Sequence, residues 1–97
     1  MMGKFNEMFP IQAVINLDSR PDRLKICLEQ EFPKLRLTTV ARFPGIVPLQ
    51  IEDKHFRGMV GCLFSHRALI EFAIEQKSNL FVFEDEKFHE LFLPFVV

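Results

Sequence analysis

The stretch from Gly61 to Glu86 constrains the fold of this chain more than any other part of the sequence. Its first half carries apolar residues at the spacing of one helical face, and a polar turn, Lys77-Ser78-Asn79, follows. The next four residues, Leu80-Phe81-Val82-Phe83, are all apolar, which favours a strand buried on both faces. A helix that leads into such a strand is typical of an α/β protein with a parallel sheet.

Three acids, Glu84-Asp85-Glu86, directly follow this apolar run. Ligands of open α/β sheets bind near the carboxyl ends of the strands. Carboxylates at that place can hold a hard divalent cation such as Mn²⁺ or Mg²⁺, and the cation can hold a diphosphate. The expected metal ligands are Asp85 and Glu86, with an affinity that depends on bound nucleotide because two carboxylates hold such ions weakly. A solvated turn is the alternative interpretation.

The amino-terminal third predicts a strand and a helix. Residues 13–17 form an apolar, β-branched run, which indicates a second buried strand. Asp18 or Ser19 can cap a helix from about Arg20 to Glu31, and Pro33 is expected to end it. The side chains expected on its buried face are Leu24, Cys27, Leu28 and Phe32.

The middle of the chain predicts a third strand and the long helix. Residues 35–40 alternate between apolar and polar, which indicates a strand, and residues 42–48 contain two prolines and a glycine, which indicates a loop. The long helix is expected over residues 59–76, after a polar stretch that could form a short helical turn. Gly61 and Ser65 would let its backbone pass close to another segment. Its expected buried stripe is Leu63, Leu69, Ile70, Ala73 and Ile74.

These elements predict one α/β domain spanning residues 1–97, a partial Rossmann-like three-layer sandwich. We expect about three mostly parallel strands and two main helices. The 97 residues are 48% hydrophobic and 26% charged, which fits a globular chain and argues against disorder. There are 12 Phe but no Trp or Tyr, so we expect most of the phenylalanines in the core. Residues 1–10 and 87–97 show no clear period.

Charge and cysteine usage exclude some classes of function. The net charge of −1 argues against a nucleic-acid binder, which would show a basic excess. Cys27 and Cys62 have no metal-ligand spacing and are interpreted as buried free thiols of a reducing compartment. We see no signal peptide and no apolar run of about 20 residues that could span a bilayer. The expected location is therefore cytoplasmic, with a peripheral place at the inner membrane left open.

Four residues outside the acidic triplet could carry chemistry. Arg20 and Arg23 could grip a phosphate, or they could be a solvated first helical turn. Asn16 lies in an apolar strand and needs partners, so it is either a strut for a neighbouring loop or a ligand contact. His66 could bind substrate or serve structurally. It forms no catalytic dyad with Ser65, because adjacent helical residues point in different directions.

Four pieces of the chain occur in the order found in glycosyltransferase family 25, which this sequence resembles. The family contains lipooligosaccharide galactosyltransferases and procollagen galactosyltransferases. The resemblance covers about residues 12–86. The pieces are Val14-Ile15-Asn16-Leu17 with Arg20-Pro21-Asp22-Arg23, then Ala41-Arg42-Phe43-Pro44-Gly45-Ile46, then Gly61-Cys62-Leu63-Phe64-Ser65-His66, and last Phe83-Glu84-Asp85-Glu86.

The resemblance implies a GT-A-like fold that binds a UDP-sugar and a divalent cation, usually Mn²⁺. It implies transfer of galactose or glucose, as in lipopolysaccharide biosynthesis, to a glycan or lipooligosaccharide acceptor or to hydroxylysine of a collagen-like protein. The residues that it assigns to the donor site are Asn16, Arg20, Arg23, Arg42, Gly61, Ser65, His66 and Glu84, and those that it assigns to the metal are Asp85 and Glu86.

Two departures limit what the resemblance implies. The family usually ends its acidic motif with Asp where this chain has Glu86, and the longer side chain moves the carboxylate. The family's catalytic domains are also longer. We therefore expect a truncated, donor-binding half, without the acceptor half or an identified catalytic base. The alternatives are a non-catalytic remnant that self-associates through its Phe-rich carboxyl terminus, and an unrelated phosphate-binding α/β domain.

Overall fold

The structure is a computed structural model that describes the backbone of residues 2–85 and 92–95 and the side chains of residues 4–85. Its sheet has the strand order β2-β1-β3-β4, with β2, β1 and β3 parallel and β4 antiparallel to β3. The prediction of an α/β fold with a parallel, partial Rossmann-like sheet is confirmed. The elements are α1 (Met2–Met8), β1 (Ile11–Asn16), α2 (Pro21–Ile26), η1 (Cys27–Glu31), α3 (Phe32–Lys34), β2 (Ala41–Pro44), α4 (Lys54–Gln76), β3 (Leu80–Glu84) and β4 (Phe92–Phe95).

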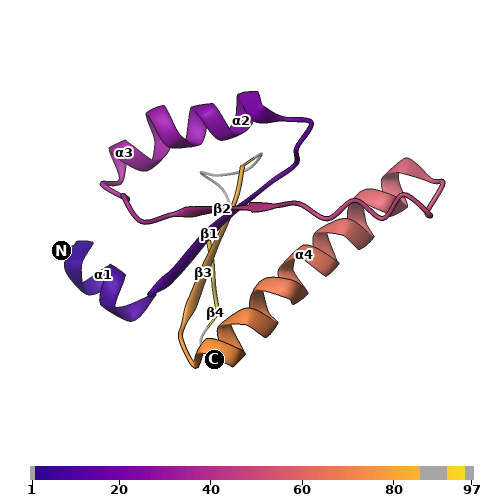
Figure 1. Ribbon diagram of the computed structural model, residues 1–97. Coiled ribbons are helices and arrows are strands. Elements are labelled where there is room, and N and C mark those ends of the chain that lie inside the picture. Colours follow the sequence, from indigo (N-terminus) through magenta and orange to yellow (C-terminus); the bar gives the residue numbers. More distant parts are fainter. Residues whose placement is uncertain (1, 86–91, 96–97) are drawn as a thin grey trace.

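Helices cover both faces of the sheet, which gives three layers (Figure 1). Alternate residues of β3 point to opposite faces. Phe81 and Phe83 pack in a core cluster with Cys27 and Phe32 of the first helical segment. Leu80 and Val82 pack in a second cluster with residues of α4. The all-apolar run of β3 is therefore explained by burial on both sides, as the sequence predicted.

The order of the strands places β1 between its two parallel partners. The chain passes from β1 to β2 on one side and later enters β3 on the other side of β1. The gap between the carboxyl ends of β1 and β3 is thus the point where strand order reverses, the usual ligand-binding place in such sheets. Ile15 pairs with Glu84, so Asn16 and Asp85 follow at neighbouring strand ends.

The helical segment formed by α2, η1 and α3 differs from the prediction at both ends. Arg20 occupies the amino-terminal cap position, and no side chain there makes a capping hydrogen bond to the helix. The predicted cap by Asp18 or Ser19 is therefore wrong. The helical path continues beyond Pro33 to Lys34 through the π-helical turn η1. A π-turn changes the hydrogen-bond pattern ahead of a proline, which has no N–H to donate, so the helix need not stop there. Leu28, expected in the core, is exposed.

The strand predicted over residues 35–40 is wrong, and β2 lies over residues 41–44 instead. Residues 35–37 close the preceding helix: the Leu37 N–H donates to Phe32 O at 2.9 Å, and Arg36 adopts a positive φ of 57°. Leu37 is buried in the cluster under this helix. The alternation of apolar and polar residues comes from packing at a helix end. A period of two cannot distinguish such an end from a strand.

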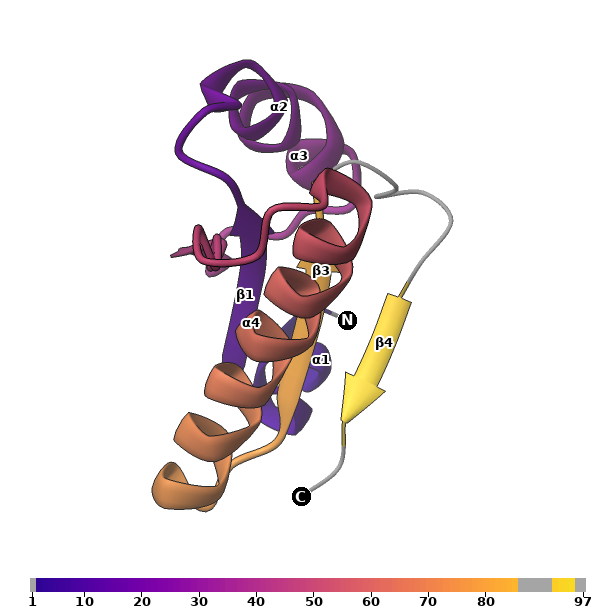
Figure 2. The same cartoon turned by 90° about the vertical axis from the view of Figure 1, so that its right-hand side faces the viewer.

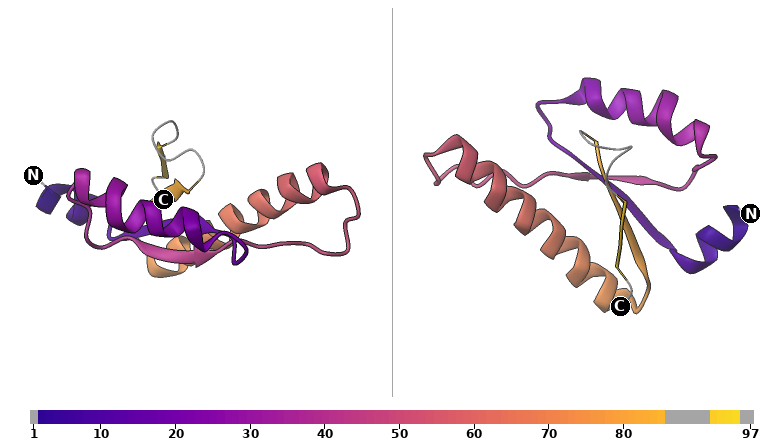
Figure 3. Two further views of the ribbon diagram at one scale, coloured as in Figure 1. Left: turned by 90° about the horizontal axis from the view of Figure 1, so that it is seen from above. Right: turned by 180° about the vertical axis from the view of Figure 1, so that it is seen from behind.

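Helix α4 begins at Lys54, five residues before the predicted start. Asp53 caps it, because its carboxylate accepts a hydrogen bond of 2.8 Å from the Phe56 N–H. The helix ends at Lys77 in the left-handed conformation, as the predicted turn requires. Of its expected buried stripe, Leu69 and Ala73 are buried, but Leu63 and Ile74 are exposed. The amino-terminal part of α4 extends beyond the sheet (Figures 1 and 3).

The elements near the two ends of the chain were not predicted, because the hydrophobic pattern there has no helical or strand period. Residues 2–8 form α1. Residues 92–95 form β4, which lies beside β3 at the edge of the sheet (Figure 2). An edge position tolerates the missing N–H of Pro94. Within the described ranges, none of the helices combines the length and apolar character that crossing a membrane needs.

Candidate functional site

Asn16 is the central polar residue at the carboxyl end of the sheet. Its side chain is buried, with 2% exposed. The amide nitrogen Nδ2 donates to Arg20 O at 2.9 Å and to Asp85 Oδ2, and Oδ1 accepts from Arg42 Nε at 2.9 Å. The buried amide therefore has partners on both atoms and joins three segments. This arrangement supports the interpretation of Asn16 as a strut.

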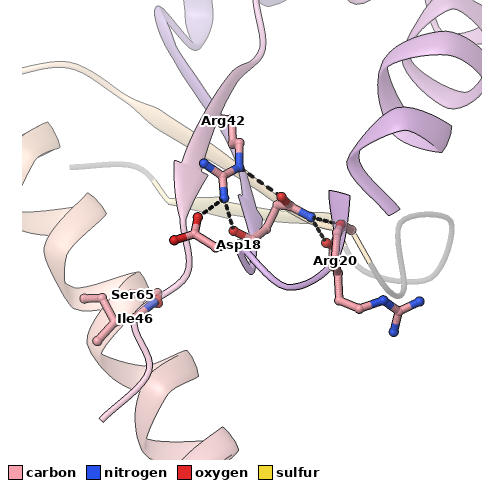
Figure 4. Close-up of polar contacts among 7 residues, drawn as sticks. Asp18, Arg20, Arg42, Ile46 and Ser65 are labelled. Carbon is pink, nitrogen blue, oxygen red and sulfur yellow. Dashed lines mark hydrogen bonds and ion pairs between the residues drawn. The ribbon is translucent and has the colours of Figure 1, made fainter. Parts of the chain in front are cut away.

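Arg42 braces the loop that follows β1. Besides Asn16 Oδ1, its guanidinium donates to the backbone oxygen of Asn16 at 3.1 Å and forms an ion pair with Asp18. Figure 4 shows the side chain of Arg42 directed at Asp18 and away from Arg20. Because Arg42 makes these contacts, its role in the structure is to hold the strand ends and the loop in place.

The two arginines of the first helical turn have different surroundings. Arg20 pairs with Asp22 through Nε and Nη2, at 2.9 and 2.8 Å, and its side chain points away from Arg42 (Figure 4). This hydrogen-bonded pair lowers the pKa of Asp22 to about 2. Arg23 is half-buried and lines a hollow on the α4 side of the strand ends. Arg20 fits the solvated-turn alternative, whereas Arg23 lies where a ligand could reach it.

The hollow lies between the amino-terminal half of α4, the segment after β2, and the ends of β1 and β3, with a volume of about 1030 Å³. The predicted site residues that line it are Arg23, Gly61, Ser65, His66, Glu84 and Asp85. Asn16, Arg20 and Arg42 are not among its lining residues. Lys54 and Arg57 also line it, and no sequence pattern indicated either residue. Only the extension of α4 by five residues brings these two cations to the hollow.

Gly61 and Ser65 bring α4 into contact with the segment after β2. A Cβ atom on Gly61 would lie 2.3 Å from the backbone oxygen of Ile46, so only glycine fits. Ser65 Oγ accepts a hydrogen bond of 2.9 Å from the Ile46 N–H, and these two residues lie side by side in Figure 4. The same hydroxyl donates to Gly61 O at 2.8 Å. The predicted close approach therefore exists, and it forms one wall of the hollow.

Cys62, His66 and Glu84 form a cluster on the rim of the hollow. The Cys62 thiol donates to Glu84 Oε1 at 3.3 Å, and His66 Nε2 lies 3.2 Å from the same oxygen. Partial desolvation of the thiol and the neighbouring Glu84 carboxylate raise the pKa of Cys62. The prediction of a buried Cys62 was wrong, since the residue is exposed. The i, i+4 spacing of Cys62 and His66 was the one sequence signal for this cluster.

Some predicted positions lie outside the side chains that the structure describes. Glu86, the second predicted metal ligand, is one of them. His55 is exposed and lines the hollow.

Comparisons of the chain with protein-family models, with curated proteins and with solved structures gave no match.

Proposed function

We propose that this chain binds a nucleoside-diphosphate hexose, with UDP-hexose as the expected donor, together with a divalent cation. In this proposal the chain is the donor-binding part of a hexosyltransferase of the family 25 type. The sugar would be galactose or glucose. The acceptor would be a glycan, a lipooligosaccharide or a hydroxylysine, and the expected compartment is the cytoplasm.

One observation carries the proposal. Asp85 and Asn16 are joined by a hydrogen bond across the gap between β1 and β3, beside the hollow that Asp85 lines. This gap is where the strand order reverses and where sheets of this kind bind nucleotides. A carboxylate and a buried amide thus meet at the expected ligand position, although they lie 69 positions apart in the sequence.

The charges around the hollow suit a diphosphate held with a cation. Arg23, Lys54 and Arg57 line it and can attract phosphate oxygens. Arg57 is also bonded through its guanidinium to the backbone oxygen of Ile51 at 2.7 Å, which fixes its position. Asp85 adds a carboxylate to the lining of the hollow, and a diphosphate beside it would need a cation between the like charges.

Asp85 fits a hard cation. Asn16 donates to one carboxylate oxygen, Oδ2, which orients the group and leaves Oδ1 able to ligate. Mn²⁺ and Mg²⁺ prefer oxygen ligands, and diphosphate oxygens and waters can complete the set. A cation held there would supply Lewis-acid neutralisation of the leaving diphosphate. The residues of this chain would hold and orient the donor.

Isothermal calorimetry with UDP, with and without Mn²⁺, tests the proposal. We expect weak UDP binding that Mn²⁺ strengthens, and that strengthening should be lost in Asp85→Asn. The matched control is Glu71→Gln, an exposed carboxylate of α4 that is paired with Arg67. No UDP binding in either condition, or binding that Asp85→Asn leaves unchanged, contradicts the proposal.

The two arginines of the first turn provide a second test. Arg23→Gln should weaken UDP binding, because Arg23 lines the hollow. Arg20→Gln should leave UDP binding nearly unchanged, because that side chain pairs with the exposed Asp22. A larger effect at Arg20 than at Arg23 would mean that the nucleotide binds elsewhere.

A second candidate function is self-association of a non-catalytic chain. Three apolar side chains, Phe56, Met59 and Leu63, are exposed along the amino-terminal half of α4. Their spacing places them on one helical face, which another copy could cover. Analytical ultracentrifugation should then show a dimer that Leu63→Lys dissociates. A concentration-independent monomer removes this candidate, and the Phe-rich carboxyl terminus has no described side chains to add to it.

A further inference from the structure

We propose that Cys62, His66 and Glu84 form a binding site for one Zn²⁺ ion. The three potential ligand atoms, one from each residue, lie within 4.8 Å of one another. Cys62 and His66 lie one helical turn apart on α4, and Glu84 ends β3. The inference does not rest on the proposed nucleotide binding.

The distances fit a tetrahedral ion. With bonds of about 2.3 Å to sulfur and about 2.0–2.2 Å to nitrogen and oxygen, tetrahedral Zn²⁺ places its nitrogen and oxygen ligands roughly 3.3–3.6 Å apart and sulfur roughly 3.5–3.7 Å from either. Glu84 Oε1 lies 3.3 Å from Cys62 Sγ and 3.2 Å from His66 Nε2. Two of the three distances between ligand atoms are therefore already close to those that the ion requires. The third distance, from Cys62 Sγ to the His66 ring nitrogen, can shorten by rotation of the exposed Cys62 side chain.

The ligand types select zinc over the hard cations. A thiolate, an imidazole and a carboxylate are the three side-chain ligands that Zn²⁺ uses in proteins, whereas Mg²⁺ and Mn²⁺ favour oxygen. Coordination converts the Cys62 thiol to a thiolate, and its proton passes to solvent. The Glu84 oxygen that now accepts from this thiol becomes a ligand instead. This site is thus chemically distinct from the cation proposed at Asp85.

The surrounding structure holds the ligands in place without a metal. Gly61 and Ser65, the neighbours of the two helical ligands, fix α4 against Ile46. Farther along the helix, Leu69 and Ala73 pack in one cluster with residues of β3, which carries Glu84 at its end. The Ile46 contacts therefore fix the part of α4 that carries Cys62 and His66, and the apolar cluster fixes α4 against β3. Such preorganisation lowers the cost of assembling a metal site.

The site has an open position. Cys62, His66 and Glu84 all line the hollow, so a fourth ligand would enter from it. Three protein ligands and one exchangeable ligand are the pattern of zinc sites that bind water or a substrate oxygen. We therefore expect the bound ion to take small oxygen or nitrogen ligands from solution.

Competition titration with a chromophoric zinc chelator tests the site, using the reduced, metal-free full chain without nucleotide. We expect one Zn²⁺ per chain, and Cys62→Ser should weaken its affinity by at least about tenfold. His66→Gln and Glu84→Gln should weaken it as well. The matched controls are Cys27→Ala, at the buried second cysteine, and His55→Asn, at another histidine of the same hollow; both should keep the affinity.

Co²⁺ provides a second readout, and its first part needs only the wild-type chain. In the wild-type chain, Co²⁺ should give the near-ultraviolet band of a thiolate ligand, and Zn²⁺ should abolish it. The band should persist in Cys27→Ala and be lost in Cys62→Ser, with far-ultraviolet circular dichroism as the check on folding.

The inference is overturned if the chain shows no stoichiometric zinc binding, gives no thiolate band, or binds zinc only when UDP is present. Affinity that is equal in the wild type and in Cys62→Ser also overturns it. Zinc binding without any UDP binding would remove the proposed function and leave this site, whereas UDP binding without zinc binding would do the reverse.

Discussion

Replacement of Gly61 by alanine tests how α4 forms the wall of the hollow. The added Cβ would lie 2.3 Å from the Ile46 backbone oxygen and 3.2 Å from Pro48 Cδ. Ordinary van der Waals contact begins near 3.4 Å, so the helix and the segment after β2 must separate by about 1 Å. The obstacle is a backbone atom, which cannot rotate away as the end of a side chain can.

Two opposing effects set the magnitude. Overpacking costs about 1–3 kcal/mol, and a weakened hydrogen bond from the Ile46 N–H to Ser65 Oγ adds about 1 kcal/mol. Alanine gains about 1 kcal/mol over glycine in a helix interior. We therefore expect Gly61→Ala to lower the free energy of unfolding by about 1–3 kcal/mol. For a domain of this size that is a fall in Tm of roughly 5–20 °C.

Gly58 of the same helix is the matched control. No atom lies within 4 Å of a Cβ built there, so Gly58→Ala should raise the free energy of unfolding by up to about 1 kcal/mol. Urea unfolding followed by circular dichroism at the helix signal is the assay, because the chain has no Trp or Tyr for fluorescence. If Gly61→Ala is as stable as wild type, or as stable as Gly58→Ala, the close approach is not a constraint and the reasoning fails.

Three further predictions concern buried polar groups. Asn16→Asp should destabilise the fold at neutral pH by about 2–3 kcal/mol in urea unfolding, because the new carboxylate replaces the Nδ2 donor and faces Asp85. Ser65→Ala should lower the free energy of unfolding by about 1–2 kcal/mol, since the Ile46 N–H loses its acceptor. Burial raises the pKa of Cys27 to about 11 from 9.0, so its protonated form stabilises the fold fully below pH 9 and progressively less toward pH 11. The stability difference between wild type and Cys27→Ala should therefore shrink over that interval.

The elements with strong local signals could be predicted from the sequence. The run from Leu80 to Phe83 is a strand because every residue is apolar, and both faces of β3 are covered. The turn at Lys77 and the small residues of α4 were also identified correctly. The predicted strand over residues 35–40 failed because a buried Leu37 at a helix end gives the same alternation as a strand.

The candidate site was harder to predict than the fold. The motif order named Arg23, Ser65 and Asp85, which line one hollow. It also named Arg20 and Arg42, and their side chains form ion pairs outside that lining. Residue type alone cannot tell an arginine that meets a ligand from one that supports a loop, because both use the same guanidinium and differ only in its neighbours.

The sequence was sufficient to predict that this chain forms an α/β sheet, that its apolar strands are buried, and that α4 needs small residues at Gly61 and Ser65. These properties follow from local composition and spacing, which act over a few residues. The contact of Asn16 with Asp85, and those of Glu84 with Cys62 and His66, became visible only in the folded chain. Those contacts join residues up to 69 positions apart, and they depend on the order and register of strands that no local pattern encodes.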